Sequence, residues 1–297
     1  MSGNNIEADA SRCCASCGIA EVDELKLTEC TDCDLVKYCS DACRRDHKSH
    51  HLRACKKRSA ELHDELLFKQ PESSHFGDCP ICMIPLPLER EKSTMLHCCS
   101  TIICNGCYHA NYMREEEGRL RHKCPFCRQP ASTDEEFKKQ RMKRIELNNP
   151  VAMTCEGLNQ YHNGDYISAF GYYTKAAELG DAEAHYQLST LYHYGQGVEK
   201  DRGKGMYHSK EAAIGGHPIA RYNIGIWNAL HGNTERAVKH FIIGANLGDD
   251  DSIQTLMGMF KKGVVSKEVL AAALRAHHAA VDATKSPQRE AAKIARI

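Results

Sequence analysis

Residues 79–127 carry cysteines whose types and spacing suit metal binding. They form three C-x-x-C pairs and one Cys-Cys doublet: Cys79 and Cys82, Cys98 and Cys99, Cys104 and Cys107, Cys124 and Cys127. A C-x-x-C turn lets two sulfurs reach one ion, and two such turns complete a closed tetrahedral site. Thiolate sets favour zinc or iron–sulfur clusters. The spacing therefore predicts two zinc ions, which replace the hydrophobic core that so short a segment cannot assemble.

This segment resembles a RING finger of the all-cysteine subclass. Besides the cysteines, the resemblance rests on Ile81, Pro125 and Arg128. In ubiquitin ligases of that family, these positions contact the ubiquitin-conjugating enzyme, and the arginine braces the transferred ubiquitin. The resemblance implies a cross-brace, with one zinc on Cys79, Cys82, Cys104 and Cys107 and the other on Cys98, Cys99, Cys124 and Cys127.

The middle of the segment departs from an ordinary RING pattern. An ordinary RING has C-x-H-x-x-C there, and the histidine position falls on Thr101. His97, Cys98 and Cys99 stand in a row instead. We expect Cys98 to be the ligand, but His97 is an alternative because its spacing to Cys99 is less strained than two adjacent ligands. The irregular spacing also leaves open a zinc-held scaffold without ligase activity.

A second set of candidate ligands lies nearer the N-terminus, within residues 13–56. It contains seven cysteines and one histidine: Cys14, Cys17, Cys30, Cys33, Cys39, Cys43, His51 and Cys55. The last four form two i, i+4 pairs, a spacing that places both side chains on one helical face. Over its full length this unit resembles a MYND-type zinc finger. The resemblance implies interleaved pairing, with one zinc on Cys14, Cys17, Cys39 and Cys43 and the other on Cys30, Cys33, His51 and Cys55.

Several neighbouring residues of this first finger are not expected to bind metal. Cys13 is a spare thiol, and His47 and His50 fall outside the ligand register. MYND fingers commonly bind proline-containing peptides through a glutamine and a tryptophan on the last helix, but Arg44 and Lys48 stand at those positions here. The helix is basic without interleaved aromatic residues, so nucleic acid is not an expected partner.

The composition indicates a reducing compartment and no membrane partner. Lys plus Arg and Asp plus Glu both number 39, so no global charge field points to nucleic acid or an anionic membrane. No apolar run approaches the ~18 residues of a membrane span. The N-terminus has neither the basic nor the apolar region of a signal peptide. The seventeen cysteines are therefore expected to be metal ligands in the cytoplasm or nucleus, and not secreted disulfides.

Beyond residue 149 the sequence changes to a repeat of small and aromatic residues. Three junctions align without gaps, and their glycines, Gly180, Gly216 and Gly248, are 36 and 32 residues apart. A period in this range is typical of stacked helical hairpins. Each glycine is expected to end a helix in the left-handed conformation that glycine adopts most easily. We expect about four hairpins by this period.

These repeats resemble Sel-1-like repeats, which are relatives of the tetratricopeptide repeat. The clearest copy lies at residues 188–201, and Gly157 and Gly225 hold the usual glycine position after a junction. The resemblance implies that the repeats bind a protein substrate or a peptide. The order of MYND-like, RING-like and Sel-1-like parts resembles that of a protein family abundant in diatoms and other stramenopile algae.

The chain is predicted to be mainly α-helical, with two small zinc-stabilised cross-brace domains followed by an α-helical repeat solenoid. The parts are a disordered N-terminus (1–12), a MYND-type finger (13–56), a linker helix (57–75), a RING-type finger (76–130), a basic linker helix (131–149), Sel-1-like repeats (150–281) and a C-terminal tail (282–297). The basic linker helix is interpreted as a solvated helix between two domains, with a nuclear-import signal as the alternative.

Two functions fit this organisation. In a RING-type ubiquitin ligase, the second finger recruits a conjugating enzyme and the repeats hold the substrate. Such a ligase needs no catalytic nucleophile, because catalysis is positioning of the thioester, and no G-x-S-x-G, Walker A or H-E-x-x-H motif is present. In a non-enzymatic adaptor, the fingers and repeats each bind a protein. Ile81, Pro125 and Arg128 together favour the ligase, with about four Zn²⁺ ions, two per finger, as cofactors.

Overall fold

The computed structural model describes residues 13–22, 26–130 and 133–295. The disordered segment predicted at residues 1–12 lies outside these ranges. The chain divides into two compact units, residues 1–69 and residues 70–297. Each unit is described by itself below.

The first unit consists of a small sheet and one long helix. Strands β1 (Thr28–Glu29) and β2 (Lys37–Tyr38) pair antiparallel. Helix α1 (Asp41–Phe68) begins at Ser40, whose side chain accepts a hydrogen bond from the Cys43 N–H. This helix continues without a break through residues 57–68, while residues 69–75 are not helical. The helical part of the linker predicted at 57–75 is therefore an extension of the first finger's own helix, which ends where the backbone of Lys69 turns extended.

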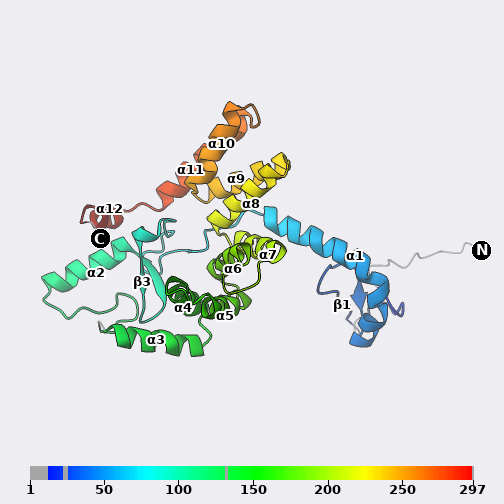
Figure 1. Ribbon diagram of the computed structural model, residues 1–297, viewed down its shortest axis with the longest axis horizontal. Helices are drawn as coiled ribbons and strands as arrows, with labels where there is room; N and C mark the ends of the chain where they lie inside the picture. The colour runs from blue at the N-terminus through cyan, green and yellow to red at the C-terminus, as the bar shows by residue number, and fades with distance from the viewer. Residues whose placement is uncertain (1–12, 23–25, 131–132, 296–297) are drawn as a thin grey trace, which may run out of the picture. The chain divides into compact units, whose positions relative to one another are not determined.

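The second unit begins with the second finger. A short 3₁₀ turn, η2 (Arg90–Lys92), precedes the hairpin of β3 (Ser93–Leu96) and β4 (Thr101–Cys104), and helix α2 (Asn105–Glu117) follows. The hairpin is antiparallel, and both β3 and β4 contact η2 or α2 (Figure 1). Its small core combines cysteines with Leu86, Leu96 and Ile103.

Helix α3 (Asp134–Glu146) is the predicted basic linker helix, and it begins with a capping box between Thr133 and Glu136. Two of its basic side chains are engaged within the unit. Arg141 forms an ion pair with the buried Glu156, with 2.8 Å between Nε and Oε2. Arg144 Nε donates a hydrogen bond to the carbonyl oxygen of Cys98 at 3.1 Å. The helix is therefore packed on the unit through these two residues.

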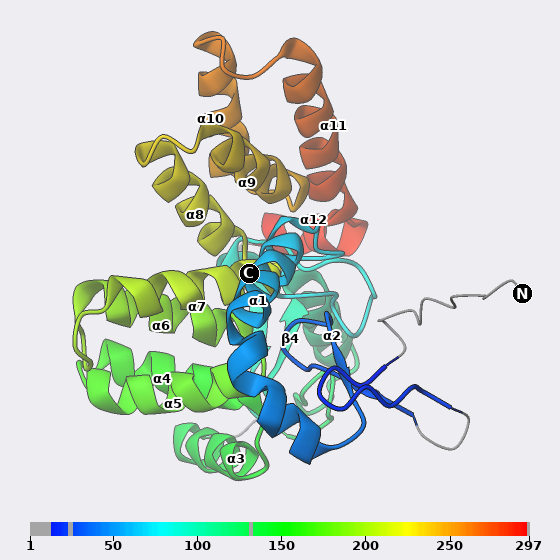
Figure 2. The same cartoon turned by 90° about the vertical axis from the view of Figure 1, so that its right-hand side faces the viewer.

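Eight further helices follow, in which α4 packs with α5, α6 with α7 and α8 with α9, while α10 and α11 both pack against α9 (Figure 2). Their bounds are α4 (Pro150–His162), α5 (Tyr166–Glu178), α6 (Ala182–Tyr194), α7 (Arg202–Ile214), α8 (Pro218–Leu230), α9 (Thr234–Asn246), α10 (Asp250–Lys261) and α11 (Lys267–Ala283). The fold is thus mainly α, with a helical repeat solenoid after the cysteine-rich region.

Glycines inside the repeats make room for a facing aromatic ring. A Cβ added at Gly157 would lie 2.5 Å from Tyr173, and one added at Gly225 would lie 2.6 Å from Phe241. Both aromatic side chains are fully buried. These glycines therefore set how closely the two helices of a pair approach.

The segment predicted as a C-terminal tail is partly helical. Helix α12 (Pro287–Ile294) begins at Ser286 and contacts α2 of the second finger. Ala292 is buried in this contact region of the second unit. Residues 287–294 are therefore part of the second unit and not a free tail.

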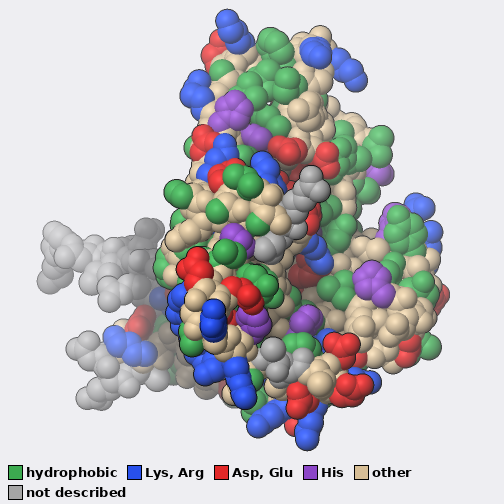
Figure 3. Space-filling model, turned by 90° about the vertical axis from the view of Figure 1, so that its left-hand side faces the viewer, with side chains coloured by type: hydrophobic (Ala, Val, Ile, Leu, Met, Phe, Trp, Pro, Cys, Tyr) green, Lys and Arg blue, Asp and Glu red, His purple; other side chains and the backbone are tan. Residues whose placement is uncertain are grey.

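No helix within the described ranges is long and apolar enough to cross a membrane. On the face drawn in Figure 3, Lys and Arg side chains are interspersed with Asp and Glu side chains. Such a mixture does not form a field of one sign over that face.

Replacing the junction glycines by alanine should separate the cost of a positive φ from the cost of a steric clash. Gly180 and Gly216 both have a positive φ, 84° and 81°, but only Gly216 meets a neighbour, because its added Cβ would lie 2.6 Å from the carbonyl oxygen of Ser73. Gly180→Ala should lower the free energy of unfolding by about 1 kcal/mol, and Gly216→Ala by roughly 2–3 kcal/mol. Denaturant unfolding followed by circular dichroism measures both, and equal losses would contradict the close approach.

Candidate metal centres

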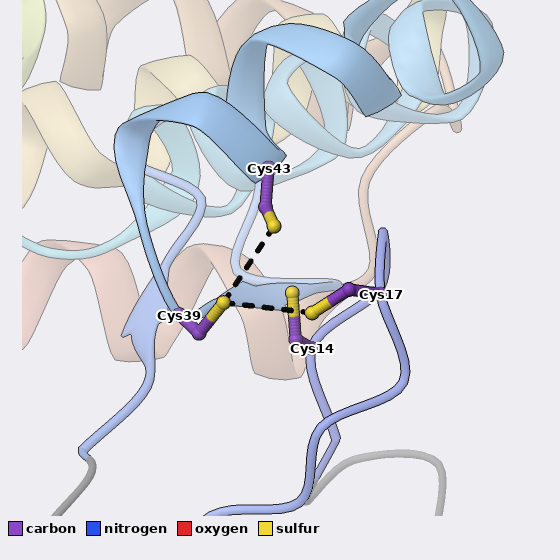
Figure 4. A group of neighbouring side chains, drawn as sticks. All are labelled: Cys14, Cys17, Cys39 and Cys43. Atoms are coloured by element: carbon purple, nitrogen blue, oxygen red, sulfur yellow. Dashed lines mark hydrogen bonds between the residues drawn. The ribbon is translucent and has the colours of Figure 1, made fainter.

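The described residues bring the sixteen predicted ligands together in four groups of four. Within each group the ligand atoms lie within 4.8 Å of one another. Two groups belong to the first finger: Cys14, Cys17, Cys39 and Cys43 (Figure 4), and Cys30, Cys33, His51 and Cys55. Two belong to the second finger: Cys79, Cys82, Cys104 and Cys107, and Cys98, Cys99, Cys124 and Cys127.

The distances within these groups fit a tetrahedral zinc ion. With Zn–S bonds of about 2.3 Å, the edge of the tetrahedron measures about 3.8 Å. The Sγ atoms of Cys30 and Cys55 are 3.8 Å apart, and so are those of Cys82 and Cys104. A disulfide would need about 2.0 Å, and the described cysteines are free thiols. The donor sets therefore suit zinc.

Four of the C-x-x-C turns share one backbone pattern. The N–H of the residue after the second cysteine donates to the carbonyl of the first, from Gly18 to Cys14 at 2.8 Å, from Asp34 to Cys30 at 3.3 Å, from Met83 to Cys79 at 2.8 Å and from Arg128 to Cys124 at 3.0 Å. This bond closes the turn and holds both thiols on the same side. The ligand geometry is thus built into the backbone of each turn.

The residue after the second cysteine has a left-handed backbone in five places. The residues are Gly18, Asp34, Met83, Ser100 and Arg128, with φ between 52° and 77°. Left-handed φ is uncommon outside glycine. Ser100 follows the Cys-Cys doublet, so the irregular stretch ends in the same backbone conformation as the regular turns.

Cys98, and not His97, joins the second group of the second finger. The Sγ of Cys98 lies 3.4 Å from that of Cys127. The His97 ring instead packs against Phe137 of α3, with the ring centroids 5.7 Å apart. The two adjacent cysteines both reach the same group because Arg144 and the left-handed Ser100 hold the backbone on either side of Cys99.

The histidine of the first finger, His51, is buried and packed against neighbouring side chains. Nε2 of His51 lies 3.0 Å from the Sγ of Cys33. The His47 ring stacks on His51, with centroids 5.8 Å apart, and its Nδ1 lies 3.1 Å from the Tyr38 hydroxyl. His47 is therefore not a ligand, but it is also not the solvated side chain that its position outside the register indicates.

Within these groups, the first cysteine of a turn ionises most easily. Burial opposes the charge on Cys79, but N–H groups of Cys104, Cys82 and Ile81 outweigh it and lower the pKa of the thiol to about 7. By contrast, burial and the neighbouring thiol of Cys124 raise the pKa of Cys98. A cation is needed before all four thiols of a group ionise together.

The three residues predicted to contact a conjugating enzyme have different environments. Ile81 is 41% exposed, Pro125 is half-buried and Arg128 is exposed. The Arg128 Nη1 donates to Oδ1 of Asn111 on α2 at 3.3 Å. Phe126, which the sequence reasoning did not single out, is 47% exposed beside Pro125. Each of the two turns thus presents an apolar side chain to solvent.

A fifth cluster consists of His75, Glu183 and His217. Oε2 of Glu183 lies 3.4 Å from Nε2 of His75 and 3.3 Å from Nε2 of His217, and Arg90 pairs with the other carboxylate oxygen. His75 and His217 also stack, with ring centroids 4.2 Å apart. No sequence motif marks this cluster, because its members are far apart in the chain.

This cluster is a buried ion-pair network and not a metal centre. The Ala220 N–H donates to Nδ1 of His217 at 3.2 Å, so the proton of the neutral ring resides on Nε2 and points to Glu183. Burial lowers the pKa of His217 to about 4, so the ring is neutral at pH 7. Burial opposes the charge of Glu183, but His217, His75 and Arg90 hold its pKa below its ordinary value. The guanidinium already neutralises this carboxylate.

These features define a protein with thiol-rich finger domains and a helical repeat solenoid. Residues 14–55 match the family model of the MYND finger. Residues 155–181, 182–217 and 218–249 match that of the Sel1 repeat. The chain therefore carries a MYND finger and Sel1 repeats, and the cysteine groups of residues 79–127 fit an additional zinc finger. This combination is that of a protein-interaction adaptor.

Curated relatives match part of the chain. The DAP3-binding cell death enhancer 1 of Mus musculus is 24% identical over 186 residues, covering 49% of this chain and 36% of that protein. The Rattus norvegicus protein of the same name is 23% identical over 186 residues, covering 49% of this chain and 36% of that protein. The chain thus spans about a third of the length of these relatives.

Solved structures of repeat proteins are also similar. A Sel1 repeat protein from Oxalobacter formigenes has a TM-score of 0.44 at 24% identity, over 60% of this chain and 74% of that one. A protective antigen of uropathogenic Escherichia coli displaying an SLR fold has a TM-score of 0.40 at 20% identity, over 48% of this chain and 33% of that one.

Zinc analysis of two variants should distinguish the adjacent candidate ligands. The purified protein is expected to hold about four zinc ions, one per group. Cys98→Ser should lose one ion, because Cys98 lies in a group, whereas His97→Ala should keep all of them. Elemental analysis of the folded protein gives the counts. Loss of an ion in His97→Ala alone would assign the ligand to His97.

The free energy of unfolding of the second unit should decrease as the pH falls, because unfolding lets His217 bind a proton. The unfolded His217 binds a proton near pH ~6.5, but the folded one does so only at about 4. The unfolded state therefore binds more protons within this window, and the free energy of unfolding decreases as the pH falls. His217→Gln should make that decrease shallower by up to ~1.4 kcal/mol per pH unit.

The measurement is denaturant unfolding at several pH values between these limits. His162→Gln, at an exposed position in α4, serves as the matched control and should leave the slope unchanged. An unchanged slope in His217→Gln would mean that this ring already takes up its proton in the folded protein near pH 6.5.

Proposed function

We propose that this protein is a zinc-dependent protein-interaction adaptor whose second finger recruits a ubiquitin-conjugating enzyme, as a RING-type ubiquitin ligase does. The zinc part rests on four groups of donors with tetrahedral spacing. Sel1 repeats generally mediate protein–protein contacts, so the repeats would hold the substrate or partner protein. The mouse relative is itself named for binding another protein.

The observation that favours recruitment of a conjugating enzyme is the exposure of apolar side chains on two metal-binding turns. Ile81 and Met83 flank the second cysteine of one turn, and Phe126 lies within another; all three are exposed. The turns need their cysteines for folding, but folding gives no reason to expose these large side chains. A small apolar patch with a few anchor residues suits a weak protein partner.

Ligase activity in this proposal requires no nucleophile from the protein. The ligand cysteines of the second finger are mostly buried within their groups, and metal binding would occupy their sulfurs. Ubiquitin would pass from the thioester of the conjugating enzyme directly to the substrate amine, and the finger would contribute orientation. Arg128, held by Asn111 of α2, would restrain the thioester.

The second candidate is an adaptor without ligase activity. It is favoured by the direct attachment of the finger to the repeat unit, because residues 70–297 form one compact unit. In that case the second finger would serve as structural support for the solenoid. With either function, we propose that the protein works where thiols stay reduced, in the cytoplasm or nucleus.

Ubiquitin discharge onto free lysine distinguishes the two functions. Ile81→Ala removes apolar contact without changing a ligand, and should reduce the discharge rate at least ~10-fold at unchanged zinc content. Arg128→Ala should slow discharge with little loss of enzyme binding, because its role is restraint of the thioester. Single-turnover assays with charged conjugating enzymes measure both rates.

The control is Leu120→Ala, at an exposed apolar residue of the same finger outside the metal-binding turns. It should discharge ubiquitin like the wild type. If the wild-type protein accelerates discharge with no enzyme of a broad panel, the adaptor without ligase activity is the function.

A further inference from the structure

The C-terminal helix α12 packs directly against the second finger, where α12 and α2 lie side by side (Figures 1 and 2). The contact is close at Gly106, since an added Cβ there would lie 2.7 Å from the backbone nitrogen of Arg289. Gly106 immediately precedes the ligand Cys107. The backbone of α12 therefore approaches the finger next to one of its metal-binding groups.

The Arg289 side chain reaches from α12 into the turn that follows Cys82. Its Nη2 lies 3.6 Å from the Sγ of Cys82 and donates to the carbonyl of Ile84 at 3.0 Å. Its Nη1 donates to the carbonyl of Pro85 at 2.7 Å. One planar guanidinium thus contacts a ligand sulfur and the backbone directly after that ligand.

The charge of a four-cysteine zinc site explains why a cation belongs there. Four thiolates around one Zn²⁺ carry a net charge of about −2. That charge is costly in a half-buried site unless a neighbouring cation or hydrogen-bond donor compensates it. Arginine stays protonated under all ordinary conditions and offers a fixed fork of donors.

We propose that Arg289 is an outer-sphere residue of the metal centre formed by Cys79, Cys82, Cys104 and Cys107, where it compensates the excess negative charge and holds the backbone directly after Cys82. This inference rests on the proposed binding of zinc in that group. It makes α12 a component of the second finger, contributed from 207 residues beyond Cys82.

The other centre of the second finger is supported differently. There Arg144 of α3 donates to the backbone carbonyl of the ligand Cys98. A change at Arg289 should therefore affect one centre and leave the other as an internal reference.

The test is cysteine alkylation of the zinc-loaded full chain under competition by a chelator, with the modified cysteines identified by peptide mass spectrometry. In Arg289→Met, alkylation of Cys79, Cys82, Cys104 and Cys107 should be about 10-fold faster than in the wild type. Cys98, Cys99, Cys124 and Cys127 should react at the wild-type rate. Arg289→Lys retains the charge without the fork and should give an intermediate rate. Lys293→Met, at an exposed position of α12, is the matched control.

The outcomes separate this inference from the proposed function. If zinc protects all eight cysteines equally in the wild type and in Arg289→Met, the role of Arg289 is overturned while zinc binding stands. If both centres of Arg289→Met lose protection together, the arginine supports the finger as a whole, and its specific role is overturned. If zinc does not protect Cys79, Cys82, Cys104 and Cys107 in the wild type, zinc binding in this group fails, and the inference fails with it.

Discussion

Gathering four ionisable side chains within 4.8 Å is the constraint on which both fingers depend. Backbone N–H groups lower the pKa of Cys79, but burial raises the pKa of Cys104 and Cys107 in the same group. A divalent cation bound between the four side chains removes the repulsion between their thiolates. The short strands and single helices around these groups have little other core, so the free energy of metal binding is in large part the folding free energy of these segments.

The second finger differs from an independent module because polar side chains connect it to the helices around it. Arg144 holds the backbone at Cys98, Arg289 holds the turn after Cys82, and Arg90 pairs with the buried Glu183 of α6. Each of these contacts joins the finger to a helix or loop distant in the sequence. The finger and the repeats therefore form one structural unit, in which the orientation of the exposed turns is fixed relative to the solenoid.

The regular features of this protein could be predicted from sequence because each depends on local spacing. The C-x-x-C turns determine their own backbone, and the repeat is visible in glycines such as Gly216, whose φ is 81°. The sequence favoured Cys98 over His97 as the ligand but did not exclude His97, because the position of the histidine ring depends on α3, where Phe137 packs against it. The contacts of Arg289 were missed because they join segments about two hundred residues apart, and a single arginine in a basic segment carries no pattern.

The position of Arg289 in the chain also has a consequence for synthesis on the ribosome. The ligands of the second finger have all emerged once residue 127 has been made, but the guanidinium that binds the carbonyls of Ile84 and Pro85 follows only after the repeats. Domains generally fold in order as they are synthesised. The finger therefore passes through a period in which its ligands are present and its supporting arginine is not. With the role proposed for Arg289, the thiols of this group would be less protected from oxidants and competing metals during that period, whereas the ligands of the first finger are complete by residue 55.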